Sequence, residues 1–189
     1  MRKVVVSEFV TLDGVMEAPN EWQGPFWHDD MGKYKFDELF VSDAMLLGRV
    51  TYEGFAAAWP SMTDEFGFAD RMDSMPKFVA STTLKDPTWN ASVIKGNVAE
   101  EVVRLKQQPG QDILVAGSAD LIQTLMQHDL VDEYRLMVHP VVVGSGKRIF
   151  REGSAMTPLQ LVNTQTFPSG VIVLTYRPAR QEAAGETTE

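Results

Sequence analysis

The sequence predicts an α/β domain with a mixed, mostly parallel sheet and an antiparallel hairpin at its C-terminal edge. Two observations predict this class. Short apolar runs alternate with helical patterns up to about His128, which is the order of elements that builds parallel strands joined by crossover helices. After that point three strand-like segments follow with no helix between them, and Pro168, Ser169 and Gly170 between the last two form a hairpin turn signal.

Each expected element has its own local signal. Three consecutive valines at the start of segment 3–10 predict an interior strand that is covered on both faces. Pro60 ends one predicted helix, Asn97 and Glu100 form a capping box that opens a second, and Ser118 is the expected N-cap of a third. The remaining strands are expected at residues 44–48, 76–82, 92–97, 112–117, 133–143, 159–167 and 171–176, and the helices at 31–42, 51–59, 64–74, 98–107 and 119–128.

Composition limits the classes of function. The chain of 189 residues is 44% hydrophobic, which is enough for one core, and we expect a single domain over residues 1–177 and a disordered tail over 178–189. The formal net charge of −9 argues against a nucleic-acid or anionic-membrane surface. The chain has no cysteine and its three histidines lack metal-ligand spacing, so no metal site is expected. No apolar segment suits a signal sequence or a membrane span, which predicts a cytoplasmic protein.

Two predicted strands lead through a glycine directly into a helix. The segments LLGRVTYE and LVAGSADL place Gly48 and Gly117 at these turns. A helix N-terminus offers free backbone N–H groups, so either turn could hold a phosphate, with Arg49 adding charge and Thr51 or Ser118 a hydroxyl. Alternatively, the glycines only make tight connections, because neither turn has a GxGxxG or Walker A pattern. Two such turns at the carboxyl ends of parallel strands favour a ligand site.

Five blocks carry a family resemblance. They are MRKVVVSEFVTLDGVM, SDAMLLGRVTYEGFAAAWP, PKFVASTTL, ILVAGSADLIQTLMQHDLVDEYRL and HPVVVGSGKRIF. In this order they resemble the dihydrofolate reductase-like family that includes the RibD C-terminal domain, the reductase domain of riboflavin biosynthesis, and most of all its small stand-alone bacterial members. The resemblance covers Arg2 to Tyr176. It implies a three-layer α/β/α fold, an NADPH-dependent reductase that acts on a pterin- or aminopyrimidine-like small molecule, and a homodimer formed through the C-terminal strands.

The resemblance also implies which residues bind NADPH. They are Gly48, Arg49 and Thr51 for cofactor phosphate, Ser81 and Thr82 for the adenosine 2′-phosphate, Ala116, Gly117, Ser118, Ala119 and Leu121 for the diphosphate, and Val10 and Gly14 beside the nicotinamide. Hydroxyl groups after the third strand, where an NAD site would usually have an acidic residue, favour NADP. Dihydrofolate reductases proper have a Gly-Gly pair in the diphosphate turn, often with a cis peptide. This chain has Ala116 and Gly117 instead, which leaves the state of that peptide open.

Two aspartates are the candidate catalytic residues. Asp13 in the TLDG loop could be a catalytic acid, a substrate ligand or an Asx-turn residue that stabilises the loop. In the family an acidic residue near the start of the first helix binds the substrate ring, and Asp29 or Asp30 lies roughly there. Asp30 is the second catalytic candidate. Alternatively, the aspartates at this helix start act as N-cap residues and interact with the helix dipole.

Two further groups have both a structural and a functional interpretation. Trp22, Phe26, Trp27 and Tyr34 could wall a flat substrate or belong to the core. Lys147 and Arg148, after two glycines, could bind a substrate phosphate or lie on a solvated face. Because no residue is an unmistakable proton donor, we keep a second function, a non-catalytic protein that binds a nucleotide or another small ligand on the same fold.

Overall fold

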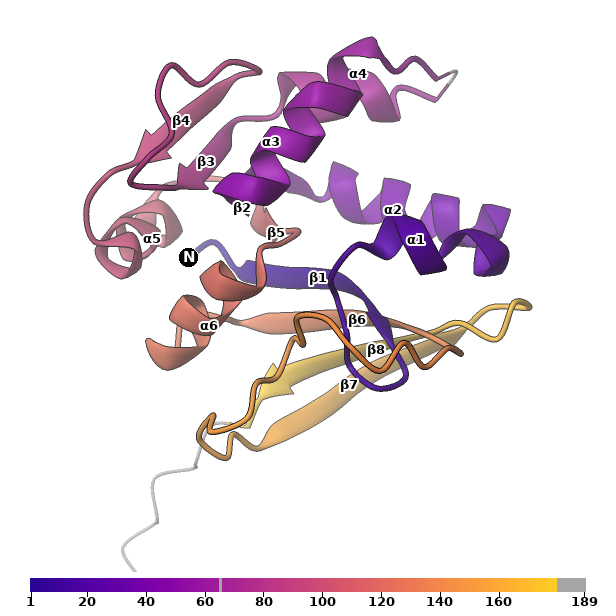
Figure 1. Ribbon diagram of the computed structural model, residues 1–189. Coiled ribbons are helices and arrows are strands. Elements are labelled where there is room, and N and C mark those ends of the chain that lie inside the picture. The colour runs from indigo at the N-terminus through magenta and orange to yellow at the C-terminus, as the bar shows by residue number, and fades with distance from the viewer. Residues whose placement is uncertain (65, 180–189) are drawn as a thin grey trace, which may run out of the picture.

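The computed structural model describes residues 1–64 and 66–179. In this part of the chain eight strands form one mixed sheet in the order β4-β3-β2-β5-β1-β6-β8-β7 (Figure 1). The strands are β1 (Val4–Thr11), β2 (Ser42–Gly48), β3 (Lys77–Ala80), β4 (Ala91–Ile94), β5 (Asp112–Val115), β6 (Glu133–His139), β7 (Leu159–Thr166) and β8 (Ile172–Pro178). Neighbouring strands from β4 to β6 are parallel, whereas β8 is antiparallel to both β6 and β7. The predicted fold class, with its antiparallel C-terminal hairpin, is confirmed.

Helices cover both faces of the sheet. One face carries α1 (Pro19–Trp22), α2 (Asp29–Phe40), α3 (Arg49–Ala58) and α4 (Phe68–Ser74), and the other carries α5 (Val98–Gln107) and α6 (Ala119–Gln127) (Figure 1). Two short 3₁₀ helices span Gly24–Phe26 and Trp59–Ser61. Among the described residues, no helix combines the length and the apolar character that crossing a membrane requires.

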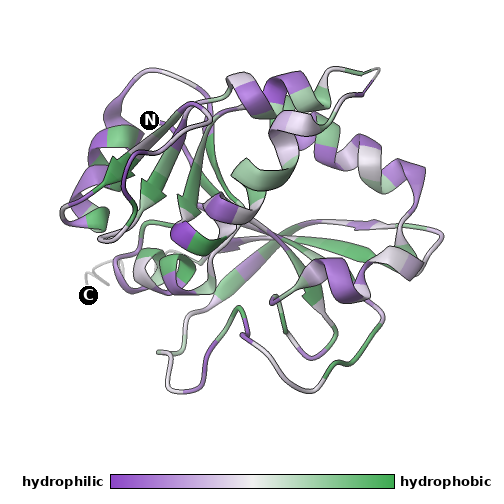
Figure 2. Ribbon diagram, turned by 45° about the horizontal axis from the view of Figure 1, so that its top comes forward, coloured by the Kyte–Doolittle hydropathy of each residue, from purple (hydrophilic) through white to green (hydrophobic). Residues whose placement is uncertain are grey.

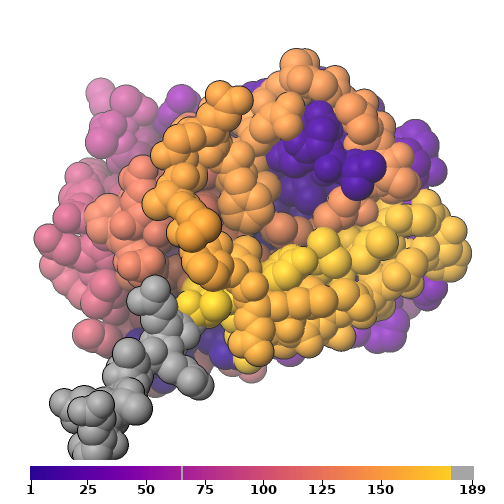
Figure 3. Space-filling view, turned by 90° about the horizontal axis from the view of Figure 1, so that it is seen from below, coloured from indigo at the N-terminus to yellow at the C-terminus, as the bar shows by residue number. Residues whose placement is uncertain are grey.

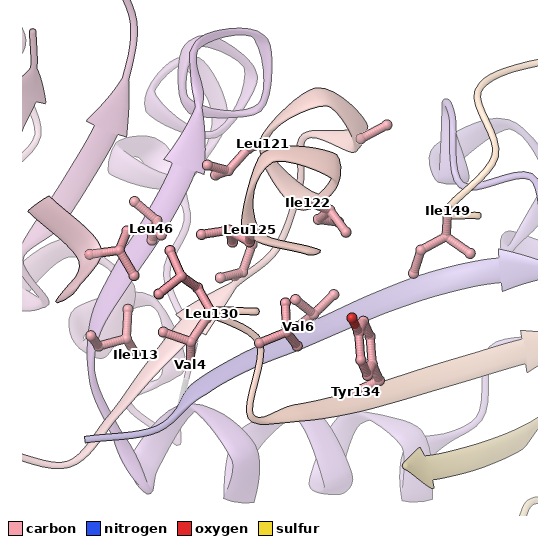
Figure 4. Close-up of a cluster of buried hydrophobic side chains, with 14 of the residues drawn as sticks. Val4, Val6, Leu46, Ile113, Leu121, Ile122, Leu125, Leu130, Tyr134 and Ile149 are labelled. Carbon is pink, nitrogen blue, oxygen red and sulfur yellow. The ribbon is translucent and has the colours of Figure 1, made fainter. Parts of the chain in front are cut away.

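The core is divided by the sheet into layers, as the valine-rich β1 predicts. Val4 and Val6 of β1 are fully buried and belong to the same apolar cluster as Ile122 and Leu125 of α6 (Figure 4). A second cluster, which includes Leu47 of β2, lies under α2, α3 and α4. Figure 2 shows the same division, with hydrophobic strands at the centre and more hydrophilic helix surfaces outside. Because side chains alternate between the two faces of a strand, a strand buried on both faces reads as a continuous apolar run.

Two predicted helix limits are wrong for identifiable reasons. The segment 31–42 does not stay helical to its end, because Ser42 is fully buried and belongs to β2. The segment 64–74 becomes α-helical only at Phe68. The Asp64 carboxylate accepts a hydrogen bond from the Phe68 backbone N–H (3.0 Å), so it caps the first turn of α4 from outside the helix.

The predicted tail begins slightly too early. Pro178 is the last residue of β8, and the backbone N–H of Ala179 donates to the Pro158 carbonyl oxygen (2.9 Å). The first two residues of the predicted tail 178–189 therefore extend the contact between β8 and the chain that leads into β7, and the other residues, 180–189, lie outside the described residues.

Candidate functional site

The chain connections reverse at the carboxyl ends of β1 and β5, and we call the place where these two strands separate the β1–β5 crevice. These two strands are parallel neighbours, and their ladder ends at the pair Val6 and Val115. The chain passes from β1 to α2 on one face of the sheet and from β5 to α6 on the other (Figure 1). Open α/β sheets bind ligands at such a switch point. This crevice is therefore the expected place for a ligand.

The two glycine turns lie in direct contact at this crevice. The Gly48 backbone N–H donates to the Gly117 carbonyl oxygen (3.2 Å). A Cβ on Gly48 would overlap the Ser118 side chain, and a Cβ on Gly117 would lie 2.6 Å from Thr51 Oγ1. Gly117 also has a φ of +93°, and the peptide bond that joins it to Ser118 is cis. Tight packing thus explains both glycines, and the same packing brings the beginnings of α3 and α6 together.

Both of these helices begin without a side-chain cap. Gly48 and Ser118 occupy the N-cap positions of α3 and α6, and within the described chain neither helix start has a side-chain capping hydrogen bond. The start of α5 is different, because Asn97 Oδ1 accepts from the backbone N–H groups of Ala99 (2.9 Å) and Glu100 (3.3 Å). The predicted N-cap position of Ser118 is correct, but its hydroxyl is not used as a cap. The first-turn N–H groups of α3 and α6 are therefore available to an anion.

An open groove of about 370 Å³ runs from these turns toward the ends of β3 and β4. Six of the predicted cofactor residues line it, namely Gly48, Arg49, Ser81, Thr82, Ser118 and Leu121. They come from three loops that are far apart in sequence, and the parallel strands β2, β3 and β5 bring these loops to one edge of the sheet. The groove is open to solvent, and its lining extends over loops that follow several neighbouring strands, which suits a ligand that contacts more than one loop.

The charges in the groove are already paired. Arg49 Nη1 forms a salt bridge with Glu53 on the next turn of α3 (2.8 Å), with both side chains close to half exposed. Asp120 in the first turn of α6 pairs with Lys147 (3.3 Å) and with Arg151. An exposed pair of this kind contributes about 0.2–1 kcal/mol, so a phosphate can compete with Glu53 for the Arg49 guanidinium.

At the far end of the groove the side chains are hydroxyls. Ser81 Oγ accepts hydrogen bonds from the backbone N–H groups of Thr83 (3.1 Å) and Leu84 (2.9 Å), which fixes the turn after β3. Its hydroxyl hydrogen stays free to donate, and Thr82 beside it is exposed. Two hydroxyl donors at this place suit a phosphate oxygen.

Six predicted cofactor residues do not line this groove, and one of them is Gly117, which packs against Thr51 in the contact between the two turns. Thr51 packs against Gly117, Ala119 is buried at the start of α6, and Ala116 packs against the apolar cluster under α3. Val10 is buried in β1, and Gly14 lies in the following loop, where its carbonyl oxygen accepts from the Ile149 N–H (3.1 Å). The predicted contact of these residues with a cofactor stays a prediction.

Asp13 joins two loops. Its carboxylate accepts from Thr11 Oγ1 (2.6 Å) and from the backbone N–H groups of Val143 (3.2 Å) and Gly144 (2.9 Å), and Arg148 donates to its carbonyl oxygen. Figure 3 shows the result, with N-terminal residues (indigo) framed by the orange chain of the later loops. The Thr11 hydroxyl and the two backbone amides lower the pKa of Asp13 from 3.8 to about 2. This geometry favours the turn-stabilising role over that of a proton donor.

Asp30 lies at the exposed start of α2. The N-cap is His28, whose Nδ1 accepts from the Asp30 backbone N–H (3.2 Å), so the alternative in which an aspartate caps this helix is wrong. Asp29 and Asp30 occupy the first turn, where a negative charge interacts favourably with the helix dipole. A catalytic role for Asp30 has no support from burial or from a hydrogen-bond network and stays a prediction.

The remaining candidates are mostly structural. Trp22 and Phe26 pack edge-on against His139, which is fully buried, and Tyr34 packs against Phe167. Of these four aromatic candidates Trp27 has the greatest exposure, 48%. Both basic side chains after Gly146 are committed to carboxylates, Lys147 to Asp120 and Arg148 to Asp13.

Sequence reasoning missed one buried carboxyl group at the crevice. Glu8 of β1 is two residues beyond the last residue that pairs with β5, and its side chain is 8% exposed overall with a fully buried Oε1. Burial raises the pKa of Glu8 to about 8, although the charge of Lys35 and a backbone hydrogen bond from Gly117 act in the opposite direction. A signal was present in the sequence, because a glutamate in a strand expected to be buried on both faces is unusual.

Comparison with known proteins identifies the family. The family model of the RibD C-terminal domain matches residues 2–173. The chain belongs to this family. It is 37% identical over 179 residues to the uncharacterized protein YyaP of Bacillus subtilis (strain 168), covering 93% of this chain and 94% of that protein. The resemblance found in the sequence is thereby confirmed.

Two solved structures show the same fold as this RibD C-terminal domain. A putative riboflavin biosynthesis protein from Shewanella sp. PV-4 superposes with a TM-score of 0.77 at 19% identity, over 94% of this chain and 99% of that chain. A dihydrofolate reductase from Enterococcus faecalis, in complex with NADP(H), superposes with a TM-score of 0.63 at 14% identity, over 93% of this chain and 96% of that chain. The dihydrofolate reductase-like architecture is therefore shared well beyond the range of recognisable sequence identity.

Proposed function

We propose that this protein is an NADPH-dependent reductase that transfers a hydride to a small heterocycle of the pterin or aminopyrimidine type. The observation that carries the proposal is the contact between the two glycine turns at the switch point. It brings together two uncapped helix starts and Arg49 at one end of an open groove. Backbone amides, helix dipoles and a guanidinium are the groups that bind a diphosphate.

The strand order supports the direction in which the cofactor would lie. Along the sheet edge the order is β3, β2, β5 and β1. Ser81 and Thr82 follow β3 and would hold the 2′-phosphate, and the glycine turns after β2 and β5 would hold the diphosphate. The nicotinamide would then lie at the end of β1, beside the predicted residues Val10 and Gly14. The bound cofactor supplies the hydride, and the residues of the chain bind and orient it.

Family membership supports the class of substrate. The chain belongs to the RibD C-terminal domain family, which the sequence resemblance connects with the reductase domain of riboflavin biosynthesis. Its fold is shared with a dihydrofolate reductase. Reduction of a pterin and of an aminopyrimidine both require a flat heterocycle to lie against the nicotinamide. We therefore propose a substrate of this shape, without assigning one compound.

Calorimetric titration with NADPH and NADH tests the cofactor assignment. We expect NADPH to bind at least about tenfold more tightly, because only NADPH carries the phosphate that the hydroxyls of Ser81 and Thr82 would meet. Equal affinities would contradict this assignment. Turnover of NADPH with a panel of pterins and aminopyrimidines then separates a reductase from the alternative, a non-catalytic binding protein, which would bind the nucleotide and oxidise none of it.

We also infer that the protein forms a homodimer through its C-terminal strands. The edge strand β7 is exposed along nearly all of its length, and Leu161, Val162 and Ile172 are between 37% and 50% exposed on this hairpin. An apolar, unpaired sheet edge is a surface that a second copy can cover. Light scattering of the eluted protein is expected to give twice the mass of the chain, and a monomer mass would contradict the inference.

A further inference from the structure

Glu8 has a position and an environment that the fold alone does not explain. It lies at the β1 side of the crevice, where β1 and β5 have separated. Its carboxyl group is more than nine-tenths buried, and Oε1 has no hydrogen-bond partner among the described residues. A buried polar atom without a partner costs about 1–3 kcal/mol, so such an atom in a folded protein calls for a physical explanation, and a catalytic role is one of those known.

The charged groups around Glu8 come from α2. Lys35 and Glu38 both act on it, the lysine favouring the charged form and the glutamate disfavouring it. Lys35 is also engaged elsewhere, because it donates to Ser7 Oγ (2.8 Å) and pairs with Glu38. Arg135 of β6 pairs with Glu38 (3.5 Å) as well. The positive charges nearby are thus shared with Glu38, and burial dominates at Glu8.

Glu38 is a useful contrast to Glu8. Both are buried glutamates whose Oε1 has no hydrogen-bond partner among the described residues, but Glu38 Oε1 lies 3.5 Å from Arg135 Nη1, and Glu38 Oε2 accepts from Ser7 Oγ (2.8 Å) and pairs with Lys35. These contacts join α2 to β1 and β6, which is a structural role. Among the described residues Glu8 has no ion pair, and it lies two residues beyond the last β1–β5 pair, within hydrogen-bond reach of the Gly117 backbone. With its pKa raised to about 8, its carboxyl group is mostly protonated at neutral pH.

We propose that Glu8 is the proton donor of the reaction, holding a proton at the nicotinamide end of the groove and giving it to the heteroatom of the C=N or C=O bond that is reduced. This inference rests on the proposed function. The carbon of the double bond gains the hydride from NADPH, which is oxidised to NADP⁺, and the heteroatom takes the proton from the Glu8 carboxyl. The resulting Glu8 carboxylate then regains a proton from water. The substrate gains two electrons and two protons in total. The hydride carries both electrons and one proton, and Glu8 supplies the other proton.

Neither predicted aspartate serves this purpose as well. Asp13 is fixed by three hydrogen bonds that favour its charged form, and Asp30 is exposed at the start of α2. A general acid works best when its pKa lies near the working pH. Of these three carboxyl groups, Glu8 alone combines burial, an unpaired oxygen and a place beside Gly117.

Proton exchange on cofactor binding tests the proposal without a substrate. NADP⁺ carries a positive nicotinamide ring, which would favour the charged form of a carboxyl group beside it. At pH 7 we expect NADP⁺ binding to release about one proton per site, measured by calorimetry in two buffers of different ionisation enthalpy. We expect NADPH, whose ring is neutral, and 2′-phospho-ADP-ribose, which lacks the ring, to release far less.

The decisive variant is Glu8→Gln, which keeps the shape and cannot ionise. We expect it to bind NADP⁺ with at most a threefold change in affinity, to release no proton, and to lose at least about a hundredfold in turnover. Glu133→Gln is the matched control, since Glu133 is a buried glutamate of β6 that pairs with Arg135 and Arg177. It should release the proton as the wild type does.

The outcomes separate this inference from the proposed function. If neither nucleotide binds the wild type, the proposed function and this inference both fail. If NADP⁺ binds but no proton is released, or if Glu8→Gln releases it equally, the reductase proposal stands and Glu8 is not the donor. Should Glu8→Gln fail to fold, carboxyl ¹³C NMR of the wild type decides: Glu8 must titrate well above 4.5 in the free protein, and its midpoint must fall with NADP⁺ but not with 2′-phospho-ADP-ribose.

Discussion

The β1–β5 crevice and the loops joined by Asp13 both follow the carboxyl ends of parallel strands, yet they differ in how their polar groups are used. Around Asp13 the carboxylate accepts three hydrogen bonds and Arg148 lies beside it. At the crevice two helix starts are uncapped and Glu8 has an unpaired oxygen. At Asp13 the satisfied groups hold two loops together, whereas at the crevice the unsatisfied groups are available to a ligand. Substitutions at the two places should therefore have different effects, and the largest is expected at Gly117.

Replacing Gly117 with alanine should lower the stability of the protein more than any other added methyl group at the crevice. The new Cβ would lie 2.6 Å from Thr51 Oγ1 on a backbone with a φ of +93°. We expect a loss of about 3 kcal/mol in the free energy of unfolding and loss of nucleotide binding. Denaturant titration and calorimetry measure the two effects.

A second glycine provides the control for this change. Gly54 lies inside α3 with open space around its Cβ position. Gly54→Ala should therefore raise the free energy of unfolding by up to about 1 kcal/mol. Equal behaviour of the two alanine variants would show that the turns do not pack as described.

Two buried glutamates should respond with opposite signs to the same substitution. The pKa of Glu8 is raised from 4.5 to about 8, so its protonated form is the stable one in the fold, and the wild type loses stability as the pH rises from 4.5 through 8. Glu8→Gln should thus be more stable than the wild type at pH 9, by about 2 kcal/mol. Denaturant titrations at pH 5 and pH 9 measure this difference, which should nearly vanish at pH 5.

Glu133 should show the reverse. Burial raises its pKa, but hydrogen bonds from Arg135 and Arg177 outweigh burial and lower it overall. The fold is therefore stabilised by the charged form at neutral pH, and Glu133→Gln should lose on the order of 2 kcal/mol at pH 7. A stabilising effect of this substitution would remove the distinction between satisfied and unsatisfied carboxyl groups.

Asp13→Asn should have a smaller effect that is confined to stability. Because the pKa of Asp13 falls from 3.8 to about 2 on folding, its contribution is present above 3.8 and is lost as the pH falls through 2. We expect the variant to melt a few degrees below the wild type at pH 7, and the difference to shrink between pH 4 and pH 2. Asp37→Asn, in an exposed pair with Lys33, should shift melting by about 1 degree or less.

The smallest expected effect concerns the charge that competes for Arg49. Glu53→Gln frees the guanidinium from its salt bridge and removes a negative charge near the groove. We expect NADPH to bind about twofold more tightly, in line with the small strength of an exposed i,i+4 pair. Weaker binding would mean that Glu53 positions Arg49 instead of competing for it.

The elements that sequence reasoning found were those with local signals. The valine run of β1, the Asn97 cap of α5 and the two glycine turns are each defined by a few neighbouring residues. The bond between Asp13 and Gly144 joins residues 131 positions apart, and no local pattern indicates it. The contact between the glycine turns could be expected from strand order, but not the overlap that makes Gly48 necessary.

Glu8 shows why part of the site was not found. As a single charged residue in an apolar strand it has no motif, and its chemistry arises from burial, from Lys35 being shared with Glu38, and from its distance beyond the last β5 pair. These are properties of the packed molecule. Asp13 is the opposite case: its sequence motif suggested a catalytic role, but its hydrogen bonds in the folded protein indicate a structural one.

The most direct test of the central claim is NADPH titration of Arg49→Met beside Lys33→Met. Both cations form an i,i+4 pair on a helix surface, but only Arg49 lies at the glycine turns. If these turns bind the cofactor diphosphate, Arg49→Met should weaken NADPH binding about tenfold or more, and Lys33→Met should leave it unchanged. Identical affinities for the wild type and both variants would contradict the claim.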